Sequence, residues 1–494
     1  MDEPDPWTSD ANQAVHISFI RPGESSSKAP STVHPKFTYP IFGEHEKIFG
    51  YQNLAINLRF TEHDLRPHIE ITYDKKYRPL GETKALDIKE TLEPFVAKES
   101  FDKAATYNDR IQDDAGAKDF RPPGQLIQSY TSKGRNFEIW SGDLRDPDVR
   151  ALVDRMQVLV SFFIEGGTPL DLEDQEWSLA RWRIYLVYEK LRIVKPKMAN
   201  YSFVGYSTSY QFIFYTPRTS KSSEPQVFMI PPSTPLHAAD LPSRVRISQF
   251  LILPAHHSYG HGSHLYDCMV KTMLASSTCI EITVEDPSEA FDDLRDIRDY
   301  ARLSSKGIFP KIKLNSTIDS KLTMNRSGLR VPTSQLIDRT LLETIRRQEK
   351  IAPRQFYRLI EMHLLSQIPP HTRQAGTARL TQKGRSSNPD DRAFYYWRLL
   401  VKQRVFKQNK EQLGQLDRGE RADKVEQTVG EIVGDYERLM LMMKKWQEAE
   451  AKSNENEDQR QLNGPKDRGK RKVLEDDDDD TDMETPKRAR SEVL

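Results

Sequence analysis

The fold is decided by residues 244–298, which read RVRISQFLILPAHHSYGHGSHLYDCMVKTMLASSTCIEITVEDPSEAFDDLRDIR. The stretch begins with an apolar run at residues 245–254, which is typical of a strand, and a polar loop follows at residues 257–262. Apolar residues at helical spacing then predict a helix, and a second apolar run at residues 280–284 predicts another strand. We therefore expect a β-loop-α-β unit, long enough for a right-handed crossover between parallel strands.

The loop of this unit contains Gly260-His261-Gly262 directly before the predicted helix. Backbone N–H groups point outward at a helix N-terminus, and glycine lets the chain approach an anion closely. Loops in this place bind phosphate groups. On these two glycines alone, however, an ordinary tight turn between a strand and a helix is the simpler interpretation.

The composition excludes several classes of protein. The chain has 494 residues, of which 37% are hydrophobic and 30% charged, and this length predicts two to four domains. Because 73 Lys and Arg balance 73 Asp and Glu, the net charge is silent about a nucleic-acid partner, whereas the basic and acidic runs gather at the C-terminus. No apolar run approaches the roughly 20 residues of a membrane helix, and the acidic N-terminus is not a secretory signal. We expect a soluble intracellular protein.

The two cysteines, Cys268 and Cys279, both lie in apolar settings of the central unit. They are predicted to be buried thiols in a reducing compartment. No Cys/His cluster has the spacing of a zinc site, so we expect no metal.

Four parts are predicted along the chain. Residues 54–60 and 68–74 alternate between apolar and polar and indicate half-buried strands, so residues 10–145 are expected to form a mixed α/β domain. Asp146-Pro147 begins a helix, which opens an α/β domain at residues 146–330. Helical spacing dominates residues 331–448, and residues 449–494 have the composition of a disordered charged tail. A linker at residues 22–35, an insertion at residues 221–242 and a break at residues 369–389 are rich in Ser and Pro.

The loop resembles the acetyl-CoA loop of the GNAT acetyltransferases, which reads Gln/Arg-x-x-Gly-x-Gly/Ala. Gly260 and Gly262 match this motif, and His257 stands in place of Gln or Arg. From about Ala14 to near Lys410, and above all in SQFLILP, GHGSHLYD and ITVEDPSEAFDDLRD, the chain is similar to fungal type B histone acetyltransferase catalytic subunits. The resemblance implies a GNAT fold at residues 146–330. It also implies transfer of an acetyl group from acetyl-CoA to histone lysines.

The resemblance also implies which residues hold the cofactor. The first strand would offer backbone groups to the pantetheine and thioester, and the loop would bind the pyrophosphate. The predicted cofactor-binding residues are Phe250, Leu251, Ile252, His257, Ser258, Tyr259, Gly260, His261, Gly262, Ser263, Ser288 and Arg295. For Arg295, a surface position on the following helix is the alternative.

Acetyl transfer to lysine requires a base, because the ε-ammonium has an ordinary pKa of about 10.4. By resemblance the general base is Glu285, which follows the run at residues 280–284, with Asp286 and Glu165 as supporting or alternative carboxylates. The attack of the amine would be direct. For Asp286 we favour a structural role, because Asp286-Pro287-Ser288-Glu289 is a near-ideal helix start with Asp at the N-cap. Apart from the resemblance, Glu285 also fits a solvated strand end and Glu165 an ordinary helix end.

The family binds a histone tail in a groove between its N-terminal and GNAT domains. Acidic groups suit a basic tail, and aromatic walls suit lysine stems. For Trp182 and Phe212 a buried core position is the alternative. The predicted substrate-binding residues are Glu44, His45, Glu46, Trp182, Tyr210, Gln211 and Phe212.

The implied partners are the tail of newly synthesised histone H4, presented with H3, and a WD-repeat β-propeller histone-binding subunit. The implied roles are chromatin assembly, silencing and DNA repair. We expect no direct nucleic-acid or membrane partner. Basic clusters at residues 468–473 and 487–490 flank an acidic run at residues 476–480 and predict nuclear import, hence a nuclear and cytoplasmic protein, with a solvated charge run as the alternative. Two other functions stay open: acetylation of another protein amine, and a non-catalytic histone-binding scaffold.

Overall fold

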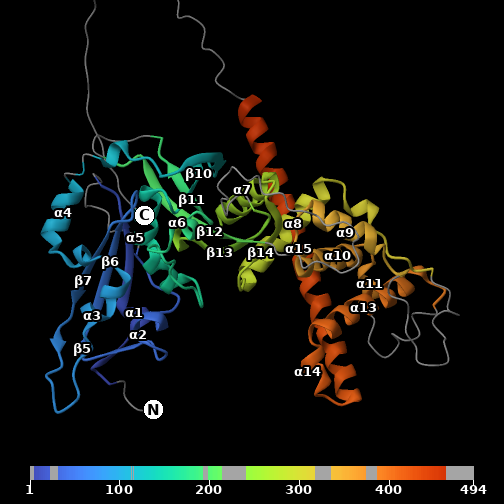
Figure 1. Cartoon of the computed structure of the whole chain (residues 1–494), viewed down its shortest axis with the longest axis horizontal. Helices are drawn as coiled ribbons and strands as arrows, with labels where there is room; N and C mark the ends of the chain where they lie inside the picture. The colour runs from blue at the N-terminus through green and yellow to red at the C-terminus, as the bar shows by residue number, and fades with distance from the viewer. Residues whose placement is uncertain are drawn as a thin grey trace, which may run out of the picture. The chain divides into compact units, whose positions relative to one another are not determined.

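The computed structural model describes residues 5–22, 32–112, 114, 116–192, 198–213, 241–317, 335–373 and 386–462, with only the backbone at residues 112 and 449–462 (Figure 1). The chain divides into two compact units, Met1–Leu439 and Met440–Leu494. All of the predicted site residues lie in the first unit.

The N-terminal elements are β1 (Thr8–Asp10), α1 (Ala11–Ala14), β2 (Val15–Ile20), β3 (Thr32–Val33), α2 (Tyr39–Phe42), β4 (Lys47–Phe49), β5 (Tyr51–Gln52), β6 (Ala55–Thr61), β7 (Pro67–Thr72), β8 (Lys75–Lys76), α3 (Ile88–Leu92) and α4 (Ala104–Gln112). A four-stranded mixed sheet with the order β3-β2-β6-β7 is their centre. Ile56, Leu58 and Phe60 of β6 are buried, as the alternation in the sequence predicts.

The central elements are β9 (Gln125–Ser132), β10 (Arg135–Asp143), α5 (Pro147–Phe163), α6 (Glu176–Leu179), β11 (Trp182–Lys190), β12 (Tyr201–Ile213), β13 (Ser243–Ile252), α7 (His261–Ala275), β14 (Cys279–Val284) and α8 (Glu289–Ser305). Their strands form one sheet with the order β14-β13-β12-β11-β10-β9. Only β13 and β14 run parallel, and every other neighbouring pair is antiparallel. The predicted β-loop-α-β unit is therefore β13-α7-β14.

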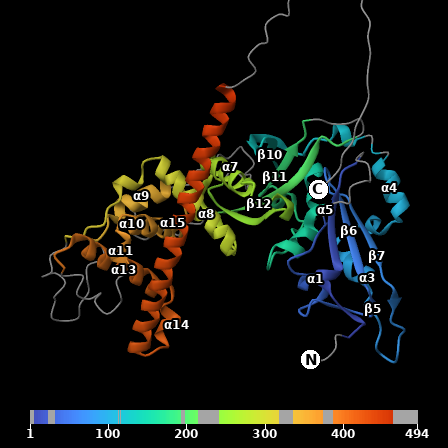
Figure 2. The ribbon, with the colours of Figure 1, turned by 180° about the vertical axis from the view of Figure 1, so that it is seen from behind.

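Helices α5 and α7 cover opposite faces of the six-stranded sheet. Along β11, Ile184 and Leu186 belong to the apolar core that contains α5, whereas Tyr185 and Val187 belong to the core that contains α7. Alternate residues of a strand point to opposite faces, which fixes the two helices on the two sides. The N-terminal sheet shares the α5 core. Helices α7 and α8 lie side by side in both views of the molecule (Figures 1 and 2).

The C-terminal helices are α9 (Arg339–Gln348), α10 (Pro353–Ser366), α11 (Pro370–Arg373), α13 (Pro389–Gln408), α14 (Lys410–Gly414) and α15 (Arg418–Leu462). The connection between α9 and α10 contacts the edge strand β14, because Ile282 N–H donates to the Lys350 carbonyl (2.7 Å). The Lys350 ammonium also donates to the carbonyls of Met273, Leu274 and Ser276 near the end of α7. These contacts complete the outer edge of the β13-α7-β14 unit.

Several predicted elements are confirmed and others need correction. The strands predicted at residues 54–60 and 68–74 are present as β6 and β7, and the helix predicted at Asp146-Pro147 is present as α5, with Asp146 as its N-cap. The sequence analysis missed β9, and α15 continues to Leu462, past residue 448, where we expected disorder to begin. The expected boundary after residue 145 falls between β10 and α5, although β9 and β10 share a sheet with β11 to β14. The four-part division stays a prediction.

Parts of the predicted linker, insertion, break and tail, at residues 23–31, 214–240, 374–385 and 463–494, lie outside the described residues. Among the helices that the structure describes, none is both long and apolar enough to span a membrane.

Candidate active site

Strand β13 pairs with both neighbours over only part of its length. Its parallel pairing with β14 ends at Ile247 opposite Val284, whereas its antiparallel pairing with β12 continues to Ile252 opposite Gly205. Where β12 advances by two residues, β13 advances by three, so β13 contains a one-residue bulge before Phe250. Beyond the bulge, β13 has no strand on the β14 side within the described part of the chain.

The backbone of Phe250 and Ile252 faces this open side. Gln249 N–H donates to the Thr208 hydroxyl, and Leu253 N–H donates to the Val204 carbonyl, so both point toward β12. Backbone groups of alternate residues in a strand point the same way, which directs Phe250 and Ile252 to the opposite side. The backbone of Leu251 faces β12. Of the three predicted backbone contacts, only Phe250 and Ile252 therefore face the unpaired side of β13.

Helix α7 begins without a side-chain cap. Its N-cap is Gly260, in the left-handed conformation with φ 80°, and this residue has no side chain to cap the first turn. The first backbone bond of the helix runs from His264 N–H to the Gly260 carbonyl (3.1 Å). The preceding N–H groups, of His261, Gly262 and Ser263, have no acceptor within the helix and are suited to an anion.

The two glycines of the loop have different physical roles. Gly260 needs its positive φ, which a side chain would strain. At Gly262 the backbone is ordinary, and an added Cβ would lie 3.5 Å from Leu294 Cδ2 and 3.8 Å from Phe250 Cε1, in normal contact. Of these two glycines, only Gly260 is therefore required for its backbone conformation.

The β9–β10 hairpin braces the loop. The Ser132 hydroxyl donates to the Tyr259 carbonyl (2.7 Å), and the Lys133 ammonium lies 3.7 Å from the centre of the Tyr259 ring. The Tyr130 hydroxyl hydrogen-bonds to Nδ1 of His261 (2.8 Å). Burial lowers the pKa of His261 to about 3, so its ring is neutral at physiological pH. Contacts from a distant hairpin thus fix the loop before any ligand binds.

His257 and Ser258 shape the middle of the loop. His257 Nε2 lies 2.7 Å from the carbonyl oxygen of Ile252, so this ring is bonded within the protein. Ser258 has a positive φ of 64°, which is uncommon for a residue with a side chain. The predicted side-chain contact of His257 with a cofactor would have to use the other ring nitrogen or replace this bond.

Glu285 lies where β14 leaves β13. Its N–H donates to the Ile247 carbonyl (2.9 Å), which places it one residue beyond the paired strand. Carboxylate oxygen Oε2 accepts from the Ser248 hydroxyl (2.7 Å), and Oε1 pairs with the Arg246 guanidinium (3.0 Å). The side chain is 38% exposed, so a substrate can reach it. An oriented, accessible carboxylate beside the open backbone of Phe250 is suited to proton transfer.

The predicted capping role of Asp286 is wrong. Helix α8 begins at Glu289, and its N-cap is Ser288, whose hydroxyl accepts from Phe291 N–H (3.4 Å). Asp286 has a φ of 32°, in the region that favours glycine. The physical reason is that Asp and Ser cap helices equally well, so the sequence offered two starts only two residues apart. The hydroxyl of Ser288, a predicted cofactor contact, is engaged in capping.

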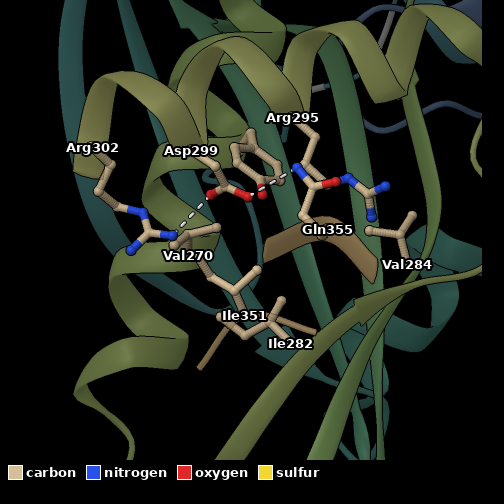
Figure 3. A pocket seen from close by; sticks show the side chains of 9 residues that line it. Val270, Ile282, Val284, Arg295, Asp299, Arg302, Ile351 and Gln355 are labelled. Carbon is tan, nitrogen blue, oxygen red and sulfur yellow. Dashed lines mark hydrogen bonds and ion pairs between the residues drawn. The ribbon is translucent and has the colours of Figure 1, made fainter. Parts of the chain in front are cut away.

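Arg295 is not a surface arginine. Its side chain is 14% exposed and pairs with Asp292 one turn earlier on α8. Together with Asp299 and Gln355 it lines a pocket of about 10 Å³, which is space for about one water molecule (Figure 3). Its guanidinium lies near Val284, at the end of β14, in Figure 3. This pocket is too small for a nucleotide, so a cofactor contact of Arg295 would have to come from outside it.

Glu165 is exposed in the turn that follows α5. The Tyr39 hydroxyl of α2 accepts a backbone N–H of this turn (2.9 Å), and the Gln249 amide donates to the Thr168 carbonyl (2.8 Å). Gln249 belongs to β13. The preceding residue of this strand, Ser248, hydrogen-bonds to the Glu285 carboxylate. Ser248 therefore contacts Glu285 itself, and Gln249 contacts the turn that contains Glu165, so two of the three predicted carboxylates depend on consecutive residues of β13.

The three predicted residues after α2 divide into two kinds. Glu46 accepts hydrogen bonds from the Asn12 amide (2.9 Å) and from the N–H groups of Thr38 and Tyr39, at the start of α2. The backbone bond from Thr38 is the main cause that lowers the pKa of Glu46. Its carboxylate is therefore used within the protein, whereas Glu44 and His45 are exposed.

The predicted aromatic residues form one continuous row. Ring centres are 4.7 Å apart for Trp182 and Tyr210 and 4.8 Å apart for Tyr210 and Phe212. All three are half-buried, and Trp182 packs against the α5 core, so the alternative of a core role accounts for part of the contacts of Trp182. Gln211 points its side chain to the other face of β12. Arg246 lies over the Phe212 ring at 4.3 Å, so the row leads to Glu285.

Comparisons with known proteins agree on one family. Residues 7–165 match the model described as histone acetyl transferase HAT1 N-terminus, and residues 322–368 match fungal HAT1, C-terminal. A histone acetyltransferase type B catalytic subunit of Aspergillus oryzae is 46% identical over 90% of this chain and 87% of its own length. Proteins of the same description from Aspergillus fumigatus and Neurospora crassa are 45% and 36% identical, over 90% and 89% of this chain and 78% and 89% of their own lengths. The chain belongs to this family.

Membership of the type B family confirms the expected fold class, a GNAT acetyltransferase fold with a mixed α/β N-terminal region and a helical C-terminal region. It also confirms the expected class of enzyme, because the relatives are catalytic subunits. Among solved structures, an aminoglycoside acetyltransferase from an uncultured soil metagenomic sample matches this chain. The match covers 35% of this chain and 88% of the acetyltransferase chain. Its identity with this chain is 14%, and the TM-score is 0.19.

The two cysteines of this family member are buried and free. Burial raises the pKa of the Cys268 thiol to about 11 and also raises that of Cys279. A thiol that stays protonated is a poor nucleophile, which agrees with a direct attack by the substrate amine. Within the described ranges, no group of three or more His, Cys, Asp or Glu side chains is arranged to hold a metal.

Sequence analysis missed the residues that hold Glu285 in place. Arg246 and Ser248 both contact its carboxylate from β13. They could have been predicted from the alternation in RVRIS, residues 244–248. This pattern places polar residues on one face of the strand next to the predicted base.

Proposed function

We propose that this chain transfers the acetyl group of acetyl-CoA to the ε-amine of lysines in the N-terminal tail of newly synthesised histone H4. The observation that carries the proposal is the position of Glu285, oriented by Ser248 at the point where β14 leaves β13. Family membership supports the histone as the class of substrate. The choice of H4, presented with H3, rests on the sequence resemblance.

The residues present fit acetyl-CoA. The uncapped N-terminus of α7, with Gly260 before it, would hold the pyrophosphate through backbone N–H groups. The open backbone of Phe250 and the N–H of Ile252, whose carbonyl is bonded to His257, would hold the pantetheine and the thioester. When bound, acetyl-CoA supplies the acetyl group at this edge of β13, beside the Glu285 carboxylate.

The chemistry of this chain is then proton transfer and orientation. Glu285 accepts a proton from the lysine ammonium, and the neutral nitrogen attacks the thioester carbonyl carbon. A C–N bond would form, the C–S bond would break, and the sulfur would leave with its electron pair. The second proton of the nitrogen would pass to that sulfur, so the products are the acetyl-lysine amide and coenzyme A as a thiol. The N–H groups on the open side of β13 would stabilise the negative charge that develops on the carbonyl oxygen.

The histone tail would lie along two surfaces. Glu44, with His45 beside it, is exposed after α2, and the row from Trp182 to Phe212 leads to Glu285. An acidic group suits a basic tail, and aromatic rings suit the apolar stems of lysine and arginine.

The partner and the location are also part of the proposal. A WD-repeat β-propeller subunit would present the histones, and roles in chromatin assembly, silencing and DNA repair follow from the resemblance. The basic clusters at residues 468–473 and 487–490 would direct import into the nucleus. Deletion of residues 451–494 should lower the nuclear fraction of the protein and leave its activity intact. An unchanged nuclear fraction would refute the import role.

The function is tested by incubation of the chain with labelled acetyl-CoA and each core histone in turn, followed by mass spectrometry. We expect acetyl-lysine in the H4 tail, at a rate that depends on Glu285. Acetylation of a different protein amine would favour a GNAT enzyme with another substrate. No transfer by the folded chain that binds histone would favour a non-catalytic scaffold.

A further inference from the structure

Arg246 occupies the position beside Glu285 that a substrate ammonium has to reach. Its Nη2 lies 3.0 Å from Glu285 Oε1, and its guanidinium lies over the Phe212 ring, 4.3 Å from the centre. The two charged side chains are 36% and 38% exposed, so the pair lies on the accessible side of the strand. The carboxylate that we propose as base is thus already paired with a cation.

The two oxygens of Glu285 have unequal partners. Oε2 accepts from the neutral hydroxyl of Ser248, which orients the carboxylate without adding charge. Oε1 faces the cation Arg246, which repels any second cation that approaches the same oxygen. The neighbouring Arg244 points its charge elsewhere, because it pairs with Glu281 (2.8 Å). Arg246 is therefore the cation in direct competition with a lysine ammonium.

We propose that Arg246 is a placeholder for the ammonium group of the substrate. It keeps Glu285 oriented in the free enzyme and is displaced when a lysine enters. This inference rests on the proposed role of Glu285 as general base. Arg246 is a positioning and specificity residue, because it acts through Glu285.

Displacement is easy because the pair is exposed and the arginine has a second contact. Exposed ion pairs are weak, since solvent screens them. After displacement, the guanidinium can keep its contact with Phe212, which does not depend on Glu285. A cationic lysine can replace Arg246 at the carboxylate, whereas a neutral side chain gains nothing by doing so. The acetylated product is neutral, so Arg246 returns and favours release of the product.

The test compares two neighbouring arginines with two peptides. Calorimetry measures binding of an H4-tail peptide that has one lysine, and of the same peptide with norleucine at that position, to the protein saturated with coenzyme A. Arg246→Gln should bind the lysine peptide about two- to fivefold more tightly than wild type, the range that an exposed ion pair supports. Arg244→Gln, the matched control, should bind it as wild type does. The norleucine peptide should bind all three proteins equally.

The gain of Arg246→Gln should shrink in high salt, because ions screen exposed charges. Equal or weaker binding of the lysine peptide by Arg246→Gln would overturn the proposal, and so would an equal gain for the norleucine peptide. Glu285→Gln separates this failure from that of the proposed base. If Glu285→Gln loses turnover while Arg246→Gln binds as wild type, only the placeholder is wrong. If Glu285→Gln keeps normal turnover, the base assignment itself is wrong.

Discussion

Two turns lead from the neighbouring strands β13 and β14 into helices α7 and α8, and the N-termini of these two helices are capped differently. The turn after β13 enters α7 through Gly260, with no side-chain cap. The turn after β14 enters α8 through Ser288, whose hydroxyl accepts a hydrogen bond from an N–H group of the first turn. An uncapped helix start can receive the oxygens of a ligand, whereas a capped start is already satisfied. The first turn is thus suited to hold the cofactor by its backbone, and the second contributes chemistry by a side chain, Glu285.

The comparison predicts that each turn can be disabled separately. Glu285→Gln keeps the shape of the side chain but removes its ability to accept a proton at neutral pH. Turnover should fall by roughly 100-fold or more, the scale of general-base loss, while acetyl-CoA affinity stays unchanged. Steady-state kinetics and calorimetry measure the two quantities. Glu289→Gln, at an exposed carboxylate in the first turn of α8, is the matched control and should keep wild-type turnover.

The next largest effect is expected at Gly262 in the uncapped turn. Gly262→Asp places a negative charge where the pyrophosphate would bind, and we expect acetyl-CoA affinity to fall by roughly tenfold or more. The fold should persist, because an acidic residue in the first turn of a helix is favourable. Gly262→Ala adds a Cβ in normal contact with Leu294, so it tests bulk without charge. Calorimetry should find clearly tighter binding for Ala than for Asp; wild-type affinity in the Asp variant would rule out this turn as the phosphate site.

The smallest effect is expected at the capped turn. Ser288→Ala removes the cap of α8 and should lower the free energy of unfolding by about 1 kcal/mol. Acetyl-CoA affinity should stay at the wild-type level, because the capped N–H is not available to a ligand. Thermal unfolding and calorimetry of the same sample measure both. A folded Ser288→Ala protein with weaker acetyl-CoA binding would restore the predicted cofactor contact and remove the contrast between the turns.

Much of the fold could be predicted from local patterns in the sequence. The apolar runs around Ile247 and Ile282 and the helical spacing between them predicted β13, α7 and β14, because each element turns regularly spaced apolar residues into the core. The loop glycines and the strand end at Glu285 were likewise visible as local features. The Asp286 cap failed for a local reason too, since Ser288 offered an equally good start for α8.

Contacts between distant segments could not be predicted. The brace on Tyr259 comes from Ser132 and Lys133, more than 100 residues earlier, on a hairpin that the sequence analysis did not detect in full. The connection at Lys350 that bonds to the edge of β14 comes from the helical region. The bulge in β13, which leaves the backbone of Phe250 open, depends on the register with β12. Such features arise from tertiary pairing, which single-sequence patterns do not contain.

The central claim is that Glu285 removes the proton of the substrate lysine. The most direct measurement is the single-turnover rate of acetyl transfer to an H4-tail peptide, for wild type and Glu285→Gln saturated with acetyl-CoA, across a range of pH. The account predicts a large loss at neutral pH that shrinks as the pH rises toward about 10.4, because more of the lysine then arrives neutral. A Glu285→Gln enzyme with normal rates, or with a loss that is the same at every pH, would contradict the claim and move the base to Asp286 or Glu165.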